Sequence, residues 1–199
     1  MNLHLDENYL LENDRVLLRP LALADFENLL PFSLHEPEIW AYSLVQPIGV
    51  QGLRDYLQQA VEARVLGKEY PLIVFDKRTN QYAGCTRFYD IHPTNQSLQL
   101  GFTWYGKAFQ GTGLNKQCKY LLLTFAFEQL GMQRVEFRAD SNNERSIAAM
   151  KSIGCTTEGI LRSNGIRPDG TRRDSIVLSI LKMEWEGGLK SKLAAKLVY

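Results

Sequence analysis

A glycine-rich turn, residues 110–115 (QGTGLN), is the feature that most constrains how this chain can fold. The preceding run, residues 97–105 (SLQLGFTWY), is typical of a strand, and the apolar residues that follow recur at helical spacing as far as Gly131. Such a turn leaves backbone N–H groups unpaired at the positive end of a helix dipole, which suits a phosphate or pyrophosphate. A tight turn that needs glycine only for its geometry is the simpler alternative.

Two common phosphate-binding loops do not fit this turn. A P-loop ends in Gly-Lys-Ser/Thr, whereas Gly113 is followed by Leu114 and Asn115. A dinucleotide-binding loop has a third glycine and opens the first βαβ unit, whereas this turn lies past the middle of the chain, after hairpin-like strands. The identity of the phosphate ligand has to come from other motifs.

Composition bounds the class of protein. The 199 residues are enough for one domain, and a net charge of +1 argues against nucleic acid as a direct partner. No apolar stretch approaches the roughly twenty residues that span a bilayer, and residues 1–15 lack the cationic start of a signal peptide. The widely spaced Cys85, Cys118 and Cys155 show no metal-ligand pattern. We expect a cytoplasmic, metal-free protein with reduced, buried thiols; a nucleophilic cysteine is the less favoured alternative.

The hydrophobic pattern predicts a mixed sheet flanked by helices. Strands are expected over residues 10–18, 70–75, 82–91, 97–105, 135–139, 156–162 and 172–182, and helices over 23–32, 52–66, 114–130 and 143–153. Short polar turns between residues 70 and 105 favour an antiparallel meander. The expected fold class is α/β of the α+β type, a single domain over residues 1–199 with a mixed, mostly antiparallel central sheet.

A second group of polar residues opens the helix expected at 143–153. Asn143 and Ser146 are three positions apart, so they share a helix face and can reach a common ligand. Ser141 and Glu144 have the spacing of a capping box, which would leave Asn143 free for a ligand. Capping and local turn chemistry by all of these residues is the simpler alternative.

Taken together, the motifs resemble those of the GCN5-related N-acetyltransferases (GNAT). The turn matches the family's Gln/Arg-x-x-Gly-x-Gly/Ala motif at Gln110 and Gly113 but has Asn115 in the last position, where an asparagine can still cap the helix. Residues 142–162 resemble the Asn-x-x-Ser…Gly-Phe…Glu-Gly-x-x-Arg signature of the RimJ/RimL-type branch, which modifies ribosomal-protein N-termini. Further matches at 101–104 and 173–185 extend the resemblance over a core of about residues 15–185, followed by a tail, 187–199.

The resemblance implies acetyl-CoA as co-substrate and no metal. It implies that the pantetheine arm of CoA pairs with the end of the strand before the turn and bonds to Asn143, and that Ser146 lies near the thioester sulfur and protonates the departing thiolate. The implied cofactor-binding residues are Thr103, Trp104, Tyr105, Gln110, Gly111, Thr112, Gly113, Leu114, Asn115, Asn143 and Ser146, with Ser146 also catalytic.

Two departures from the family pattern concern acid–base chemistry. Met150 stands where many members have a tyrosine acid, and Gln99 stands where the branch commonly has a glutamate. A glutamine cannot act as a general base. Asp90, His92 or a water could replace it, or no dedicated base exists; Asp90 and His92 are more simply solvated turn residues.

The function expected from the resemblance is acetyl transfer from acetyl-CoA to an amine by direct attack in a ternary complex. The acceptor is a small molecule or a peptide or protein, with an N-terminal α-amine as the candidate group. A non-catalytic acyl-CoA-binding sensor or partner module is the alternative, and a nucleotide-binding regulator is a third. Leu189, Leu193 and Leu197 give the tail an apolar helical face; we favour docking on the domain or on a second copy in a homodimer over a membrane anchor.

Overall fold

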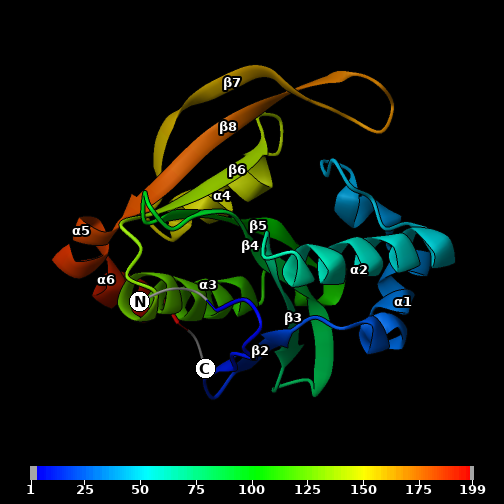
Figure 1. The fold of residues 1–199 in the computed structure, drawn as a ribbon, viewed down its shortest axis with the longest axis horizontal. Coiled ribbons are helices and arrows are strands. Elements are labelled where there is room, and N and C mark those ends of the chain that lie inside the picture. Colours follow the sequence, from blue (N-terminus) through cyan, green and yellow to red (C-terminus); the bar gives the residue numbers. More distant parts are fainter. Residues whose placement is uncertain (1–3, 198–199) are drawn as a thin grey trace.

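The computed structural model describes residues 4–197. Within this range the strands form one sheet of eight, in the order β1-β2-β3-β4-β5-β6-β8-β7 (Figure 1). All neighbouring strands are antiparallel except β5 and β6, which confirms the mixed, mostly antiparallel sheet. The strands are β1 (Leu11–Glu12), β2 (Val16–Pro20), β3 (Tyr70–Asp76), β4 (Gln81–His92), β5 (Ser97–Tyr105), β6 (Arg134–Asp140), β7 (Thr156–Ile166) and β8 (Arg172–Leu181).

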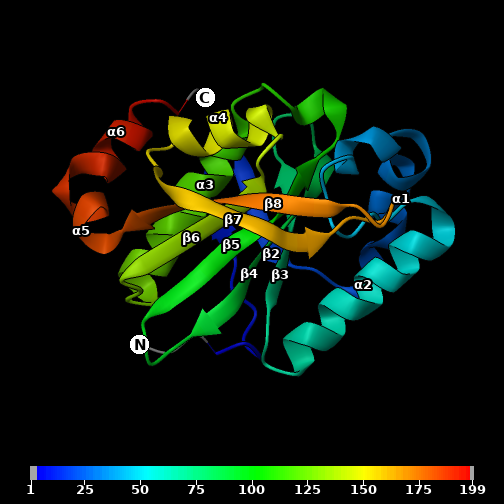
Figure 2. The same cartoon turned by 90° about the horizontal axis from the view of Figure 1, so that it is seen from above.

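Helices cover both faces of this sheet. Figure 2 shows α3 and α4 on one side and α2 on the other. The helical segments are η1 (Leu23–Asp25), α1 (Phe26–His35), η2 (Pro37–Trp40), α2 (Gly49–Val65), η3 (Lys107–Phe109), α3 (Leu114–Thr124), η4 (Phe125–Gln129), α4 (Glu144–Ser152), α5 (Lys182–Glu184), η5 (Trp185–Leu189) and α6 (Lys190–Ala194).

Each face has its own hydrophobic core. The larger core joins the sheet to α3, η4, the end of α4 and α6, and includes Leu114, Leu122 and Phe137. The smaller core joins the sheet to α1 and α2 through Leu53, Trp104 and their neighbours. The alternation of strand side chains sends neighbouring residues to opposite cores, as with Trp104 and Tyr105.

The segment predicted as one strand, residues 10–18, is instead the hairpin β1–β2. The Asn13 side-chain oxygen accepts hydrogen bonds from the backbone N–H groups of Arg15 and Val16, at 3.0 and 2.9 Å. This Asx-type turn reverses the chain so that Leu11 pairs with Leu18. The prediction failed because the apolar residues on either side of the turn looked like one continuous run.

The helix predicted over 114–130 changes form part-way along. α3 ends at Thr124 and continues as the π-helical turn η4, in which Leu130 N–H donates to the Phe125 carbonyl at 2.9 Å. Gly131, at φ +72°, then ends the helix as expected. The wider turn still directs Phe125, Ala126 and Phe127 into the larger core.

The C-terminal segment packs on the domain itself. Leu193 is buried in the larger core, Leu189 packs against it, and Trp185 Nε1 donates to Glu128 Oε1 at 2.9 Å. Through Leu189 and Leu193 the tail's apolar face thus contacts the domain, which is one of the two expected partners. Within residues 4–197, the helices are all too short or too polar to cross a membrane.

The three cysteines are buried and not in disulfides, as expected. Burial raises the pKa of the Cys118 thiol to about 11 and that of Cys155 to about 12, and raises that of Cys85 further still. Since the thiolate is the reactive form, none of them is suited to act as a nucleophile near neutral pH.

Candidate active site

The sheet splits between β5 and β6. These strands pair only where they begin, Ser97–Gln99 against Arg134–Glu136. Beyond that point β5 pairs only with β4, and β6 pairs only with β8. The facing edges of β5 and β6 therefore carry backbone N–H and C=O groups that an extended ligand can use as a partial strand.

A β-bulge lies at this split. Cys85 pairs with Trp104 while Arg87 pairs with Gly101, so β5 has one extra residue there. The extra residue leaves Phe102 at φ +48°, a conformation that is costly for a bulky side chain and that tends to occur at functional sites. Next to it, the Thr103 hydroxyl lies 2.8 Å from the Thr86 hydroxyl.

The glycine-rich turn precedes α3, and several of its backbone N–H groups have no acceptor in the described part of the chain. Gly111 and Gly113 have φ values of +73° and +87°, which glycine adopts without strain. Among the described residues, no acceptor meets the backbone N–H of Gly111, Thr112, Gly113 or Asn115. Together with the dipole of α3, these four groups form a site for an anion.

The expectation that Asn115 caps α3 is wrong. The N-cap is Gly113, and Asn115 lies one residue into the helix. Its side-chain oxygen is 3.4 Å from the Tyr105 hydroxyl, which donates to it. The left-handed Gly113 places its own carbonyl to accept from Lys116 N–H at 3.0 Å, so the helix starts without a capping side chain.

Gln110 joins the turn to the elements on either side of it. Its Nε2 donates to the Tyr105 carbonyl at 2.8 Å, and its Oε1 accepts from Arg145 Nη1 on α4. One glutamine thus connects the end of β5, the turn and the start of α4. Arg145 is a site-organising residue that the sequence analysis did not identify.

The start of α4 differs from the predicted cap. The N-cap is Asn143, whose side-chain oxygen accepts from Ser146 N–H at 3.0 Å, and Ser141 makes no capping bond. Asp140 sets this geometry because its Oδ1 accepts from Asn142 N–H at 3.0 Å. Within the described residues, Asn143 Nδ2 and the Ser146 hydroxyl have no hydrogen-bond partner, so both remain available to a ligand.

Three of the predicted cofactor residues have side chains that serve the cores. Trp104 packs against Trp40, with ring centroids 5.0 Å apart, and Tyr105 and Leu114 are buried in the larger core. These residues can reach a cofactor only through their backbone. Met150 is also buried in the larger core, so it contributes packing rather than chemistry.

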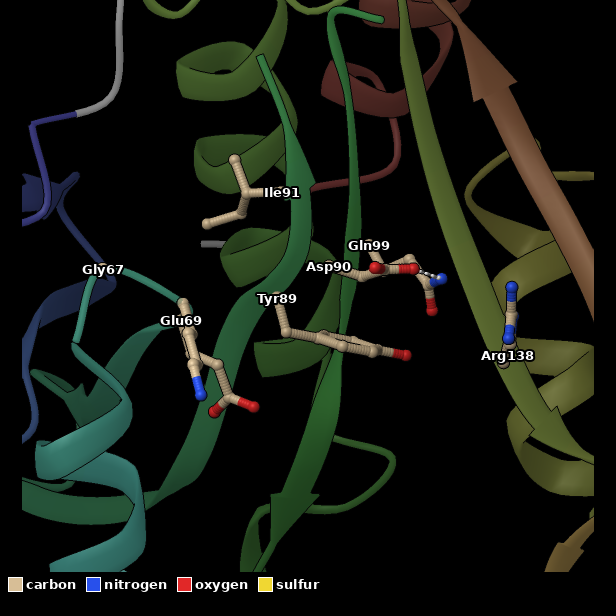
Figure 3. A pocket seen from close by; sticks show the side chains of 8 residues that line it. Gly67, Glu69, Tyr89, Asp90, Ile91, Gln99 and Arg138 are labelled. Carbon is tan, nitrogen blue, oxygen red and sulfur yellow. Dashed lines mark hydrogen bonds between the residues drawn. The ribbon is translucent and has the colours of Figure 1, made fainter. Parts of the chain in front are cut away.

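A pocket of about 500 Å³ lies at the same split, on the sheet face that bears Gln99 (Figure 3). Figure 3 shows Tyr89, Asp90 and Gln99 on the β4–β5 side and Arg138 across from them on β6. Gln99 Nε2 donates to Asp90 Oδ2 at 2.5 Å, and His92 Nε2 lies 2.9 Å from Asp90 Oδ1. The remaining lining residues are Gly67, Lys68, Glu69 and Ile91.

Asp90 enters this pocket because β4 bulges there. Asp90 has φ +49°, and β4 has an extra residue between Tyr89 and His92. The carboxylate that the family pattern has at position 99, and that this chain lacks there, is thus supplied beside Gln99 by Asp90 of the neighbouring strand. Burial raises the pKa of Tyr89 to about 12, so its phenol stays neutral. The sequence analysis left Asp90 as a turn residue because a bulge has no reliable sequence signal.

The model of the acetyltransferase (GNAT) domain matches residues 15–156. The chain belongs to the GNAT acetyltransferase family. This confirms the family expected from the motifs, and the match covers β5 and β6 on either side of the split, the glycine-rich turn and α4.

Individual relatives agree with this assignment. YdaF of Bacillus subtilis, provisionally named as a ribosomal N-acetyltransferase, is 35% identical over 104 residues, 52% of this chain. That match spans only 56% of YdaF. Its name fits the RimJ/RimL-type branch.

Solved structures share the fold. A GCN5-related N-acetyltransferase from Brucella melitensis has a TM-score of 0.89 at 24% identity, covering 96% of this chain and 86% of that one. The Microcin C7 self-immunity acetyltransferase MccE, solved with acetyl-CoA and AMP, has a TM-score of 0.74 at 22% identity, covering 85% of this chain and 93% of that one.

Proposed function

We propose that this protein transfers the acetyl group of acetyl-CoA to an amine by direct attack in a ternary complex. The observation that carries the proposal is the set of four open backbone N–H groups between Gly111 and Asn115 at the start of α3, beside the unpaired edge of β5. The pyrophosphate of CoA would bind these donors, and the pantetheine arm would run along Thr103–Tyr105. The acetyl-CoA complex of MccE, a protein of the same fold, supports this donor.

The reaction needs little from the protein beyond positioning and charge stabilisation. A neutral amine would attack the thioester carbon, and backbone N–H groups at the β5 bulge would donate to the oxygen on which negative charge develops. Asn143 Nδ2 would hold the pantetheine arm. The Ser146 hydroxyl would donate its proton to the departing sulfur.

The acceptor that we propose is the N-terminal α-amine of a peptide or protein. The amine would approach through the pocket beside Gln99, where Asp90 offers a carboxylate that can receive its proton. The name of YdaF supports a ribosomal protein as the acceptor class. The family match does not favour the alternative of a non-catalytic acyl-CoA-binding module.

The substitution Gly113→Glu tests the turn. It places a side chain and a negative charge where the pyrophosphate is proposed, so we expect the affinity for acetyl-CoA, measured by calorimetry, to fall by at least about a hundredfold. Gly131→Glu is the matched control: Gly131 has φ +72° and open space around it, so the backbone strain and the charge change are alike. A folded Gly113→Glu variant with normal acetyl-CoA affinity would show that the turn is not the cofactor site.

A turnover assay distinguishes an acetyltransferase from a non-catalytic acyl-CoA-binding module. An acetyltransferase releases CoA from acetyl-CoA when a panel of peptides with free N-termini is supplied, and mass spectrometry then finds the acetylated peptide. A binding module is stabilised against heat by acetyl-CoA and leaves every amine in the panel unmodified.

A further inference from the structure

Lys119 is a buried cation on the second turn of α3. The residue is only 4% exposed, and its Nζ donates a hydrogen bond to the Thr103 hydroxyl at 2.9 Å. The ring of Phe137 on β6 lies 5.9 Å from the same nitrogen. Lys119 therefore bridges β5 and β6 at the point where these two strands have separated.

No negative charge accompanies this lysine in the described part of the chain. No carboxylate lies within ion-pairing distance of its Nζ, and the ionisable groups that act on it are the thiols of Cys118 on α3 and Cys155 after α4. Both thiols are held neutral by burial, and β5 and β6 contribute only Thr103 and Phe137. Burial lowers the pKa of Lys119 to about 8. A buried, unpaired ammonium destabilises a fold, so its presence calls for an anion from elsewhere.

The hydrogen bond from Lys119 to Thr103 ends at the unpaired edge of β5, along which the pantetheine arm is proposed to bind. Thr103 is half-buried, lies in the β5 bulge, and belongs to the stretch whose outer edge has no β6 partner. Its hydroxyl accepts from Lys119, lies 2.8 Å from the Thr86 hydroxyl and donates to the Gly101 carbonyl at 3.4 Å. When Thr86 is the donor in the first of these contacts, only the long bond to Gly101 uses the Thr103 proton, which can turn to a ligand instead. A donor that is itself bonded to an ammonium is polarised and forms a stronger hydrogen bond to an anion.

We propose that Lys119 is a positioning residue for acetyl transfer: it orients and polarises the Thr103 hydroxyl, and its charge stabilises the negative charge that develops on the acetyl-CoA thioester as the thiolate leaves. This rests on the proposed acetyl-CoA site. Lys119 itself touches neither substrate, and the proton on the sulfur still comes from Ser146. The missing counter-ion of Lys119 is thus the reacting group itself, present only while the reaction proceeds.

The first test is a double-mutant cycle of Lys119→Met and Thr103→Val. Each single variant should lower kcat about ten- to a hundredfold with the KM for acetyl-CoA changed less than about threefold, since the interaction is strongest in the transition state. The double variant should lose little more than the worse single variant, because the two residues act as one unit. Lys192→Met, on the exposed face of α6, is the control for the same chemical change.

The pH dependence of kcat is a second test, because a purely structural role of Lys119 would not make the effect of its removal depend on pH. The ratio of wild-type to Lys119→Met kcat cancels the titration of the acceptor amine. This ratio should be constant below about pH 7 and fall as Lys119 loses its proton above the pKa of about 8. A ratio of one at every pH, or independent losses in the double variant, would overturn the proposal.

The charge effect of Lys119 can also be tested by CoA binding alone, without catalysis. The thiol pKa of bound CoA, followed by thiolate absorbance with desulfo-CoA as the blank, should be lower on the wild-type protein than on Lys119→Met. Equal thiol pKa values on two folded proteins that both bind CoA would refute the role of Lys119 and leave the proposed function standing. Failure of the wild-type protein to bind CoA would refute both.

Discussion

Single residues at the start of α4 serve the fold and, in the proposed function, also the chemistry. Asn143 uses its side-chain oxygen to cap the helix and keeps its Nδ2 free, and the cap holds Ser146 one turn into the helix. Capping therefore does not compete with ligand binding, because the two functions use different atoms of one amide. In the proposed function, the cap would thus present Ser146, the candidate acid, to the unpaired edge of β5.

Ser146→Ala removes the proposed proton donor and leaves the capped backbone N–H in place. We expect kcat to fall by about a hundredfold, the low end for a general acid, because a thiolate is a fairly good leaving group. The affinity for acetyl-CoA should barely change in calorimetry. Asn143→Ala is the comparison, since it should weaken both the helix and acetyl-CoA binding. An unaltered Ser146→Ala kcat, with chemistry shown to limit the rate, would exclude Ser146 as the acid.

Pairs of elements are held together by buried charges as well as by strand hydrogen bonds. Arg15, just before β2, forms a two-pronged ion pair with Asp76 at the end of β3, at 2.7 and 3.0 Å, and both side chains are buried. Burial by itself would raise the pKa of Asp76, but the bonds from Arg15 and Arg78 outweigh it and hold this pKa below its usual value. The β2–β3 connection is therefore sensitive to the loss of either partner.

Asp76→Asn should destabilise the protein by about 3–5 kcal/mol, because it leaves the Arg15 guanidinium buried and unpaired. In the wild-type protein this contribution is complete above the unfolded pKa of about 3.9 and is lost as the pH falls through the lower folded pKa. Urea unfolding at pH 7 and at pH 3 measures both effects. Glu12→Gln, which breaks the exposed Glu12–Lys77 pair, should cost less than about 1 kcal/mol.

At the scale of the whole molecule, the two hydrophobic cores pack against opposite faces of the sheet. In the middle of the sheet, β5 and β6 separate after their first residues. One side of this split has the turn and α4, the proposed cofactor site, and the other has the pocket with Asp90 and Gln99, the proposed acceptor site. The β7–β8 hairpin reaches the segment between η2 and α2, where Arg173 Nη1 donates to the Tyr42 carbonyl at 3.4 Å. In the proposed function, the two substrates would approach the split from its two sides.

The preferred acceptor amine depends on groups from both sides of the split. Only a neutral amine attacks: near pH 7 an α-amine, with a pKa of about 7.7–8.0, is neutral in roughly a tenth of molecules, and an ε-amine, with a pKa of about 10.4, in fewer than about one in a thousand. Asp90, beside Gln99, would receive the proton of an amine that has attacked in its neutral form, so we expect kcat/KM at pH 7 to be at least about tenfold higher for the α-amine.

Matched peptides make this measurement direct: one has a free N-terminus and no lysine, and the other is N-acetylated with a single lysine. A clear preference for the lysine peptide at neutral pH would mean that the site contains an efficient base, and Asp90→Asn would then be the variant to examine.

The sequence by itself determined the features that local signals specify. The strand at residues 97–105, the turn at 110–115, the helix stops at Gly131 and Gly154 and the family assignment all rest on periodicity, glycine geometry and ordered motifs within short stretches. Only the tertiary structure decided which distant residues meet. The contact of Gln110 with Arg145, of Gln99 with Asp90 and of Lys119 with Thr103 each joins two separate elements. Such contacts depend on strand order, on bulges that shift the register by one residue, and on a split between strands, and these arise from the packing of the whole chain rather than from any local pattern.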